Sequence, residues 1–514
     1  MSQHYFKGMF VRKKKNKSGV ISVQIISKGT GKYQVLESFG SSSDPEQIEL
    51  LAQQAKHRMS DLAGQAGFNF DIEKERALSE LFFTGLSEIR LMGTELLLGK
   101  LFDDIGFKAI KGKLFRPLVI ARLTYPVSKL KTTDYWFKYY GTVIDVDRIY
   151  RYMDKLHRKH KEAVQQISYK HTLGILDNKI SMVFYDVTTL YFEIEEPDDL
   201  RKTGFSKDGK HQNPQIVLGL LVSLDGYPLA YEIFEGNKYE GHTLLPVLES
   251  FRTKYKIEKL VVIADAGLLS HDNVEGLRDR QYEYILGARI KNESQAVKEK
   301  ILALNLKNGE STIVASDEHS KLVISYSDPR ARKDAATRKK GFEKLERSVA
   351  SGKLTKQSIN NRGYNKYLKL DGKVKVTIDR EKYKDDSKWD GLKGYLTNTD
   401  MTKDDVISNY GQLWKIEKAF RISKTDLRIR PIYHRLQTRI EAHICIAFCA
   451  YKIYKELERQ LKEKKSALSP EKVIDILKTI FKVTITMPYS KTKESRLFLP
   501  NEEQRDLLKL FQIE

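Results

Sequence analysis

Cysteine is almost absent from this 514-residue sequence, which contains two, Cys445 and Cys449. Two thiols are too few for a disulfide framework or a zinc cluster. They are four positions apart in HICIAFCAYKIY, a pattern that predicts a buried helix. We therefore interpret both cysteines as small residues of a core.

Long apolar runs are absent as well. No stretch approaches the ~20 residues that an α-helix needs to cross a bilayer. The first residues, MSQHYFKGMFVRKKKNKSG, contain no apolar segment of the kind found in secretory signals. We expect a soluble, intracellular protein without a membrane partner.

Acidic residues are in deficit. The chain has 68 Asp and Glu against 90 Lys and Arg, which gives a formal net charge of +22 and a pI of about 9.4. This surplus predicts attraction to a polyanion, foremost nucleic acid; a basic surface that only confers solubility stays open as the alternative. An anionic membrane is a weaker competitor, because no basic amphipathic anchor stands out.

The hydrophobic pattern changes several times along the chain, and a chain of this length is expected to form several domains. The first 65 residues predict a small sheet and a helix, with VRKKKNKSG as a basic hairpin tip. That tip is either a DNA-contacting arm or a solvated turn. The expected divisions are a sheet-plus-helix arm at 1–70, a helical DNA-binding region at 71–175, a first core segment at 176–299, a basic β-rich insertion at 300–400, a second core segment at 401–455 and a helical tail, suited to dimerisation, at 456–514.

The part after residue 180 has the pattern of an α/β domain. SMVFYDVTTLYFE predicts one strand, and PQIVLGLLVSLDGYPLAYEIFEG predicts two more around an Asp225-Gly226 turn. A helix, the buried strand KLVVIADAG, a short helix and the strand YEYILGARI follow. The order β-β-β-α-β-α-β-α, interrupted by the insertion, predicts an RNase H-like core in which the first and fourth strands are neighbours.

Two aspartates lie where such a sheet places its chemistry. Asp186 interrupts the apolar strand SMVFYDVTTLYFE, and Asp265 ends the strand KLVVIADAG. A carboxylate inside a buried strand costs free energy unless something compensates it. Because both aspartates would lie near the carboxyl ends of adjacent strands, they predict a site for Mg²⁺, which prefers oxygen ligands.

A third carboxylate is expected from the helical stretch that follows residue 404. At 100° per residue, Tyr410, Leu413, Glu417, Arg421 and Lys424 fall within one arc of a single helix. A purely structural helix would place apolar residues on that arc, so we predict Glu417 as the third ligand. The alternative is a solvated face with i,i+4 Glu–Arg pairing, worth only ~0.2–0.5 kcal/mol.

Together these motifs resemble the DDE transposases of bacterial insertion sequences, in the branch with an inserted β-rich segment and a Tyr-Arg-Glu-Lys signature. DVTT at 186–189 and ADAGLLS at 264–270 resemble the two aspartate motifs of that family. The basic insertion and the segment RIRPIYHRLQTRIEAHICIAFCAY are similar to the corresponding parts of the family. The resemblance extends over roughly 180–450, more than half of the chain.

The helix signature agrees with the family at three of its four positions. Tyr410, Glu417 and Lys424 keep the family spacing, whereas Leu413 replaces an arginine that contacts a DNA phosphate. The resemblance implies that Tyr410 and Lys424 hold DNA beside the cleaved end. Arg421, one turn after Glu417, is our hypothesis for the missing arginine.

The resemblance also implies a reaction and its partners. Asp186, Asp265 and Glu417 would be the catalytic carboxylates and would hold two Mg²⁺ ions, which Mn²⁺ can replace. The implied reaction cleaves transposon ends and transfers the freed 3′-hydroxyl into target DNA. The implied partners are double-stranded DNA, as terminal inverted repeats and target, and a second copy of the chain in a synaptic dimer. The implied location is the bacterial cytoplasm, at the nucleoid.

Two other functions stay open from the sequence. One is an RNase H-like nuclease that hydrolyses DNA without strand transfer, because its chemistry is the same up to the nick. The other is a catalytically inactive DNA-binding derivative, for which Leu413 leaves some room.

Overall fold

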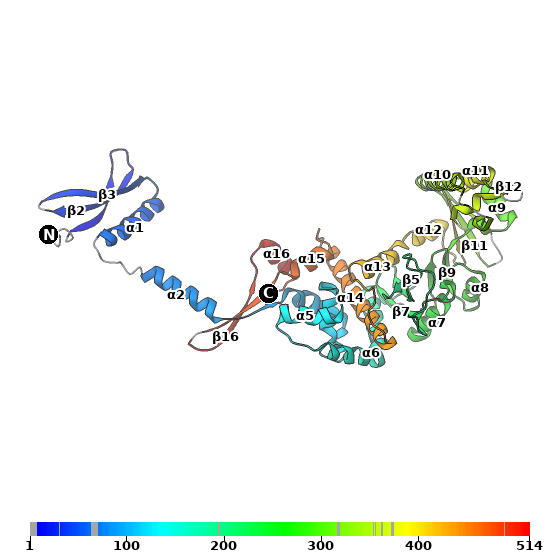
Figure 1. Ribbon diagram of the computed structural model, residues 1–514, viewed down its shortest axis with the longest axis horizontal. Coiled ribbons are helices and arrows are strands. Elements are labelled where there is room, and N and C mark those ends of the chain that lie inside the picture. The colour runs from blue at the N-terminus through cyan, green and yellow to red at the C-terminus, as the bar shows by residue number, and fades with distance from the viewer. Residues whose placement is uncertain are drawn as a thin grey trace. The chain divides into compact units, whose positions relative to one another are not determined.

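The computed structural model divides the chain into two compact units (Figure 1). The first unit contains residues 1–88 and 483–496, and the second contains residues 89–482 and 497–514. The structure describes residues 8–29, 31–62, 70–193, 196–315, 319–352, 354, 356–360, 363–371, 375–487 and 489–513. Within these ranges, no helix is both long enough and apolar enough to cross a membrane.

The first unit contains a small antiparallel sheet covered by a helix. Strands β1 (Met9–Lys15), β2 (Ile21–Gly29) and β3 (Lys32–Ser42) pair in chain order, and helix α1 (Pro45–Leu62) packs on them. Alternate residues of β2 point toward α1, because side chains of a strand alternate between its two faces. Their small core consists of Val23, Ile25, Ile48, Ala52 and Ala55. Helix α2 (Phe70–Gly85) follows.

Helices dominate the beginning and the end of the second unit. Its first helices are α3 (Lys100–Ile105), α4 (Phe115–Thr124), α5 (Lys129–Tyr140) and α6 (Val146–Ile175). The long helix α14 (Gln437–Glu463) packs against α4 and α6, and α15 (Pro470–Leu477) and α16 (Glu502–Leu510) follow it. Cys445 and Cys449 are buried in α14 and form no disulfide, in agreement with their predicted role as core residues.

An eight-stranded mixed sheet forms the centre of the second unit. Its spatial order is β10-β11-β14-β9-β8-β5-β6-β7. The strands are β5 (Met182–Tyr191), β6 (Gln215–Ser223), β7 (Pro228–Glu235), β8 (Val261–Ala264), β9 (Glu283–Ala288), β10 (Ser311–Ala315), β11 (Lys321–Tyr326) and β14 (Leu392–Thr397). Strand β5 pairs antiparallel with β6 and parallel with β8, which confirms the predicted contact between the first and fourth strands.

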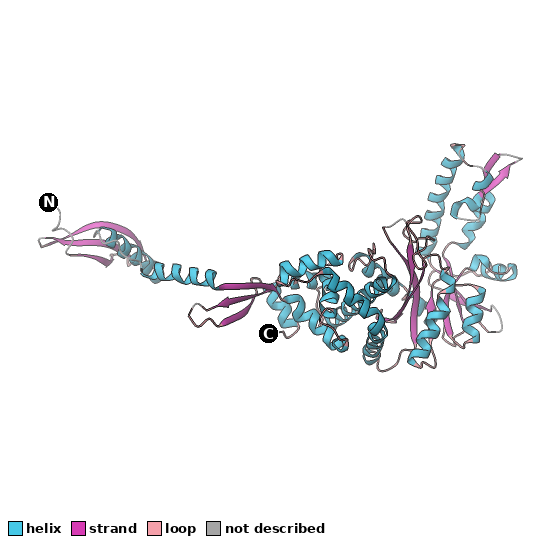
Figure 2. Ribbon diagram, turned by 60° about the horizontal axis from the view of Figure 1, so that its bottom comes forward, coloured by secondary structure: helices cyan, strands magenta, loops and turns pink. Residues whose placement is uncertain are grey.

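Helices cover both faces of this sheet. Helices α7 (Leu244–Tyr255) and α8 (His271–Asp279) contact β7 and β9, whereas α12 (Lys403–Gly411) and α13 (Trp414–Thr425) contact β8, β9 and β5 (Figure 2). Tyr185 belongs to the core under α7, and its neighbour Phe184 belongs to the core shared with α13. Asp186 therefore lies on the face of β5 that α13 covers, because strand side chains alternate.

The segment 300–400 differs from the expected separate β-rich insertion. Its strands β10, β11 and β14 pair onto β9 and so extend the central sheet. Its longest element is the helix α10 (Asp328–Ala350), and the small hairpin β12 (Leu368–Asp371) and β13 (Lys375–Ile378) and the helix α11 (Arg380–Asp386) complete it. The alternating patterns of this segment predict strands, and the structure contains them: β10, β11 and β14 join the core sheet, whereas β12 and β13 form a two-stranded sheet of their own.

The prediction of a single helix after residue 404 is wrong. Two helices occupy this stretch, α12 ending at Gly411 and α13 beginning at Trp414. Glycine has low helix propensity, and the side chain of Leu413 is 8% exposed and belongs to the main core. We attribute the break between the two helices to the packing of Leu413 in the core. As a result, Tyr410 lies on a different helix from Glu417, Arg421 and Lys424.

The stretch 456–514, expected to be a helical tail, also contains two strands. Strands β15 (Phe481–Thr486) and β16 (Lys493–Phe498) form a sheet with β4 (Leu86–Leu91), in the order β16-β15-β4. FKVTIT explains β15, because its apolar residues alternate with polar ones and its last four residues are all β-branched, and both features favour a strand. The region 71–175 is correspondingly not helical throughout, since β4 lies within it.

Candidate active site

Asp186 and Asp265 lie at equivalent heights on neighbouring parallel strands. Tyr185 of β5 is paired with Ala264 of β8, and each aspartate is the next residue of its chain segment. The backbone N–H of Val187 donates to Asp186 Oδ1 at 2.7 Å, and that of Gly267 donates to Asp265 Oδ1 at 2.9 Å. Local backbone geometry thus fixes the orientation of both carboxylates.

The Asp186 carboxylate is largely removed from solvent. Its side chain is 17% exposed. The pKa of Asp186 is raised to about 6: burial is the largest cause, and the charges of Asp265 and Glu240 add to it, whereas Lys207 and the Val187 N–H oppose the shift. Because Asp265 contributes to this pKa, the two aspartates interact electrostatically across the strand pair.

Lys207 is a cation in contact with this pair. Its Nζ donates to the Val187 carbonyl oxygen at 2.8 Å and lies 3.7 Å from Asp186 Oδ1 and 3.2 Å from Glu240 Oε1. Burial lowers the pKa of Lys207, but Asp186, Glu240 and Asp265 raise it more, so the net pKa is above its ordinary value. Lys207 therefore supplies part of the compensation that a buried Asp186 requires.

Tyr410 extends from α12 toward the same edge of the sheet. Burial raises the pKa of its hydroxyl, and Asp265, Tyr395 and Glu417 raise it further. Tyr410 therefore interacts electrostatically with two of the three predicted carboxylates, Asp265 and Glu417. The Nζ of Lys393, from β14, lies 4.4 Å from the centre of the Tyr410 ring. Burial and a charged neighbour lower the pKa of Lys393, whereas Glu417 opposes this.

Glu417 occupies the first turn of α13 and is exposed. It makes no hydrogen bond or ion pair with any residue that the structure describes. Across the described residues, no three His, Cys, Asp or Glu side chains are grouped so that they could hold a metal ion as they stand. The structure thus pairs Asp186 with Asp265 and leaves Glu417 nearby, without a partner among the described residues.

The predicted DNA-contacting side chains differ in their surroundings. Lys424 is partly buried on α13, and its Nζ lies 3.6 Å from Asp208 Oδ2. Burial lowers the pKa of Lys424, and Asp208 opposes this. Arg421 is exposed on the same helix. Leu413 is a core residue, so it cannot contact a phosphate.

Sequence reasoning missed three cations and one carboxylate of this site. Lys207 and Glu240 come from loops beside the sheet, and Lys393 and Arg330 come from the segment 300–400. None of them follows a spacing rule relative to the aspartates. The polar stretch GFSKDGK around Lys207 shows only that a loop is present, so tertiary structure alone identifies its role.

The model of the family described as Transposase DDE domain matches residues 178–453, which is more than half of the chain. A search among curated proteins gives no match. Of the solved structures, the piggyBac transposase synaptic complex with hairpin DNA is 11% identical, with a TM-score of 0.39, over 76% of this chain and 79% of that chain.

Two Mos1 structures are more distant. The Mos1 transposase paired-end complex with left transposon end is 11% identical, with a TM-score of 0.15, over 36% of this chain and 57% of that chain. The Mos1 mariner paired-end complex with Mn is 12% identical, with a TM-score of 0.14, over 45% and 72%.

Two carboxylates at the ends of neighbouring strands of an α/β sheet are compatible with an enzyme of phosphoryl transfer. The match over 178–453 then decides the family: the chain belongs to the DDE transposases. It is therefore a DNA transposase, a polynucleotidyl transferase and endonuclease, and the predicted resemblance is confirmed.

Proposed function

We propose that this transposase cleaves the ends of its element and joins the freed 3′-hydroxyl to target DNA with Asp186, Asp265 and Glu417 as catalytic carboxylates. The observation that carries the proposal is that Asp186 of β5 and Asp265, directly after β8, each follow a residue of the strand pair Tyr185–Ala264. The partial order β7-β6-β5-β8-β9, with β5, β8 and β9 parallel, supports an RNase H-like core for this site.

Members of this family generally use divalent metal ions. The donors present fit such an ion chemically, because carboxylates are hard oxygen ligands. Asp186 and Asp265 repel each other when both are charged, and Glu417 has no partner among the described residues. A divalent cation would compensate these charges. Asp186, Asp265 and Glu417 would hold it, and the proposed complement is two Mg²⁺ ions, replaceable by Mn²⁺. When bound, the metal supplies Lewis-acid activation of the attacking oxygen and neutralises charge on the phosphate.

The residues of the chain orient the reaction. The N–H groups of Val187 and Gly267 hold the two aspartates in position, which limits the reorganisation needed at the moment of phosphoryl transfer. Tyr410 and Lys424 would hold the DNA backbone beside the cut, with Arg421 in place of the family arginine. Such contacts position DNA and do not read its sequence.

The proposed partners are the terminal inverted repeats of the element, target DNA and a second copy of the chain. Two ends must be joined in one event, which is the reason for proposing a synaptic dimer. Work at the nucleoid of a bacterial cytoplasm follows from the same proposal.

The test uses purified protein, Mg²⁺ and labelled DNA carrying the repeats that flank the gene. Asp186→Asn is expected to lower the yield of strand-transfer product on the order of 100-fold or more, because one charged ligand is lost from the site. Asp225→Asn is the matched control, since Asp225 lies on the exposed β6–β7 turn and its side chain is 57% exposed.

The outcomes separate the three functions. Strand-transfer product that disappears in Asp186→Asn and persists in Asp225→Asn supports the proposal. Hydrolysis without strand transfer would identify a nuclease. Intact DNA with retained binding would identify an inactive derivative, and equal yields from both variants would remove Asp186 from the mechanism.

A further inference from the structure

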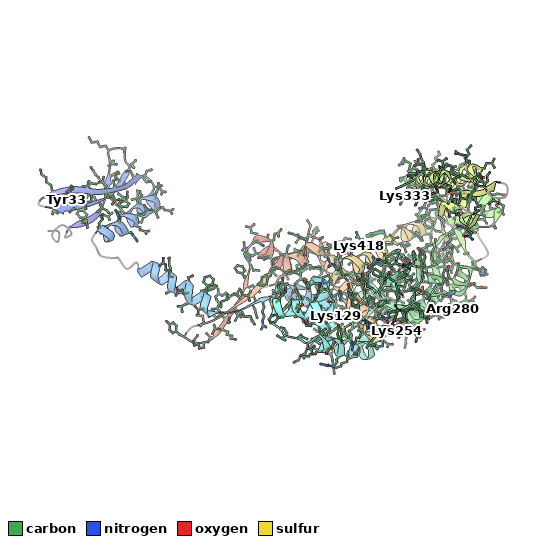
Figure 3. All side chains as sticks on the ribbon, in the orientation of Figure 1. Tyr33, Lys129, Lys254, Arg280, Lys333 and Lys418 are labelled. Carbon is green, nitrogen blue, oxygen red and sulfur yellow. The ribbon has the colours of Figure 1, made fainter. Side chains whose placement is uncertain are left out.

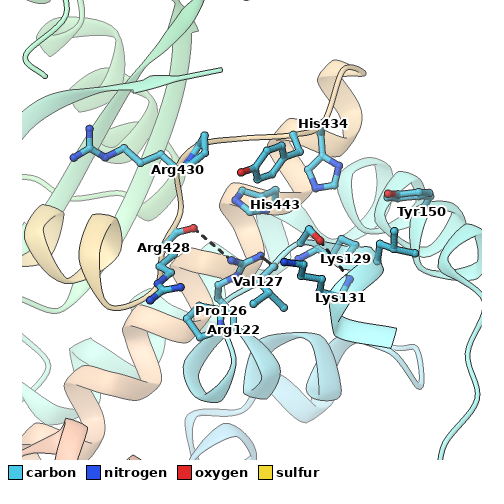
Figure 4. A pocket seen from close by; sticks show the side chains of 14 residues that line it. Arg122, Pro126, Val127, Lys129, Lys131, Tyr150, Arg428, Arg430, His434 and His443 are labelled. Carbon is cyan, nitrogen blue, oxygen red and sulfur yellow. Dashed lines mark hydrogen bonds between the residues drawn. The ribbon is translucent and has the colours of Figure 1, made fainter. Parts of the chain in front are cut away.

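A basic cavity of about 530 Å³ lies in the second unit, and neither Asp186 nor Asp265 is among its lining residues (Figure 4). It is enclosed by the end of α4, the beginning of α5 and the segment between α13 and α14. The residues that line it are Arg122, Pro126, Val127, Ser128, Lys129, Leu130, Lys131, Tyr150, Arg428, Arg430, Pro431, Tyr433, His434 and His443.

The lining has an unusual charge balance. It contains five cationic side chains, Arg122, Lys129, Lys131, Arg428 and Arg430, and no Asp or Glu among the lining residues that the structure describes. Arg430 is the one with a carboxylate partner in the described structure, because it forms an ion pair with Asp208. The charge of the other four is therefore not neutralised by the described residues around them.

Lys129 is the most informative of these cations. Its residue is only 4% exposed, and within the described part of the chain it makes no hydrogen bond or ion pair. Burial lowers the pKa of Lys129, and the positive charge of Arg122 lowers it further. The side chain is almost fully buried and lines the cavity, and its ammonium has no hydrogen-bond acceptor among the described residues, an arrangement that costs free energy.

Arg122 is comparably buried and has only weak partners. Its Nη1 donates to the backbone carbonyls of Leu427 and Arg428 at 3.4 and 3.5 Å, and its Nη2 donates to that of Val127 at 3.3 Å. Its Nε has no partner among the described residues. A guanidinium is always charged, so these neutral acceptors leave its charge uncompensated. Lys129 and Arg122 thus direct two buried positive charges toward one space.

The backbone adds to the positive potential of the cavity. Helix α5 begins at its wall, and Ser128 caps it by accepting a hydrogen bond from the Lys131 N–H at 3.3 Å. The N-terminal end of a helix favours anions. On the opposite wall, His443 Nε2 lies 3.0 Å from the Ile429 carbonyl oxygen, and its buried Nδ1 has no partner among the described residues.

A short chain of contacts connects the cavity with the carboxylate pair. Arg430 of the cavity binds Asp208, whose Oδ2 is 3.6 Å from Lys424 Nζ. The neighbouring residue Lys207 contacts Asp186. The cavity and the site therefore share one loop, and a strand of DNA at Asp186 would pass close to this loop.

We propose that the cavity is an anion site that holds a phosphate group of the DNA backbone, at a position separate from the carboxylate pair. A phosphate oxygen accepts hydrogen bonds from lysine and arginine and neutralises the charges that the protein leaves open. The assignment to DNA rests on the transposase function, whereas the assignment to phosphate rests on the cavity alone.

Inorganic phosphate is the probe for the first arm of the test. Thermal unfolding of the full chain is measured against phosphate, with sodium chloride of equal ionic strength as reference. The melting temperature of the wild type is expected to rise by a few degrees at saturating phosphate, because a ligand of the folded state stabilises it. Lys129→Met is expected to melt higher than wild type without phosphate and to lose the phosphate response.

The matched control is Lys254→Met, on α7 and outside the cavity (Figure 3). Burial also lowers the pKa of Lys254, but Glu162 and Glu232 oppose this, so its charge has acidic neighbours. Lys254→Met should keep the phosphate response. If Lys129→Met does not fold, Lys131→Met at the rim should raise the phosphate concentration for half-response several-fold.

The second arm measures binding of a duplex oligonucleotide as a function of salt. Removal of one interaction with a phosphate is expected to reduce the slope of log K against log salt by about 0.9 in Lys129→Met and not in Lys254→Met. Equal phosphate responses in wild type and Lys129→Met would overturn the anion site. An abolished phosphate response with an unchanged salt slope would overturn DNA as its source and identify a site for free phosphate.

Discussion

At the scale of single residues, the buried position of Asp186 makes ionisation of its carboxyl costly in free energy. Burial raises its pKa to about 6 from an ordinary 3.8, with Asp265 adding to the shift and Lys207 opposing it. The fold therefore favours the neutral carboxyl. The stability gained from the neutral form is fully present below pH 3.8 and is lost as the pH rises through 6.

This shift predicts a pH-dependent effect of Asp186→Asn in metal-free buffer. Near pH 4 both side chains are uncharged in the folded protein, so the variant and wild type should have similar free energies of unfolding. Above pH 6 the variant should be more stable, by at most about 3 kcal/mol for a shift of this size. Denaturant unfolding with a chelator, from pH 4 to 8, measures the difference.

Lys207→Met provides the control for this prediction. At pH 8 it should destabilise the wild type more than the Asp186→Asn variant, because only the wild type has a charge for Lys207 to compensate. Some cost should remain in both backgrounds, since Lys207 also contacts Glu240. Equal costs in the two backgrounds, or a stability gain of Asp186→Asn that is independent of pH, would contradict the assigned pKa shift.

At the scale of elements, the approach of α12 to β9 positions Tyr410. A methyl group built on Gly287 of β9 would overlap Tyr410 Oη and would lie 2.9 Å from the Ala266 backbone nitrogen. Side chains do not tolerate so close an approach. Glycine at 287 therefore allows the hydroxyl to lie directly against the strand, next to the segment that contains Asp265.

Gly287→Ala is accordingly expected to displace Tyr410 or the strand. The overpacking should cost about 1–3 kcal/mol in free energy of unfolding. The rate of DNA cleavage should fall more than the loss of stability explains, because the Tyr410 hydroxyl is displaced from its position near the carboxylates. Single-turnover cleavage at a temperature where both proteins remain folded measures this effect.

Gly411→Ala is the matched control, since a methyl group there meets nothing within 4 Å. It adjoins Tyr410 and should leave cleavage unchanged. Tyr410→Phe removes the clashing oxygen, so Gly287→Ala should cost less stability in that background. Identical costs in the two backgrounds would show that Tyr410 does not contact Gly287 in solution.

These elements also show how far the sequence predicts the structure. The neighbouring positions of Asp186 and Asp265 follow from strand order and handedness, which alternation and turn residues reveal. The break between α12 and α13 does not follow from the sequence. The predicted arc assumes an unbroken helix, whereas Leu413 is buried in the core at the point where the two helices separate. Lys207 and Lys393 reach the site from segments whose distance to it depends on tertiary packing.

At the scale of the whole molecule, the first unit contains a small body with its own core. The sheet β1–β3 and helix α1 bury Val23, Ile25 and Ile48 against one another. The tip of the β1–β2 hairpin presents Lys14 and Lys15, at the end of β1, and Lys17, which follows the strand; all three are exposed. Lys13 forms an ion pair with Glu49, so it is less available to a ligand.

Removal of residues 1–62 therefore separates folding from DNA binding. The remaining chain should keep its thermal unfolding transition, because the core of the sheet and α1 is removed as a whole and leaves no cavity behind. Its affinity for duplex DNA should fall. The dependence of that affinity on salt should become shallower, by about 0.9 in slope for each phosphate that the shortened chain no longer neutralises.

A full-length variant with Lys14, Lys15 and Lys17 changed to glutamine tests whether the hairpin tip is responsible. It should reproduce most of the decrease in affinity and slope while retaining the sheet, whose core residues it does not alter. If the truncated chain loses affinity and the triple variant does not, another surface of residues 1–62 contacts DNA. If neither variant changes the DNA affinity, the hairpin tip is a solvated turn. The positive charge that attracts DNA then belongs to the second unit, and Lys129 in its cavity is the first residue to test.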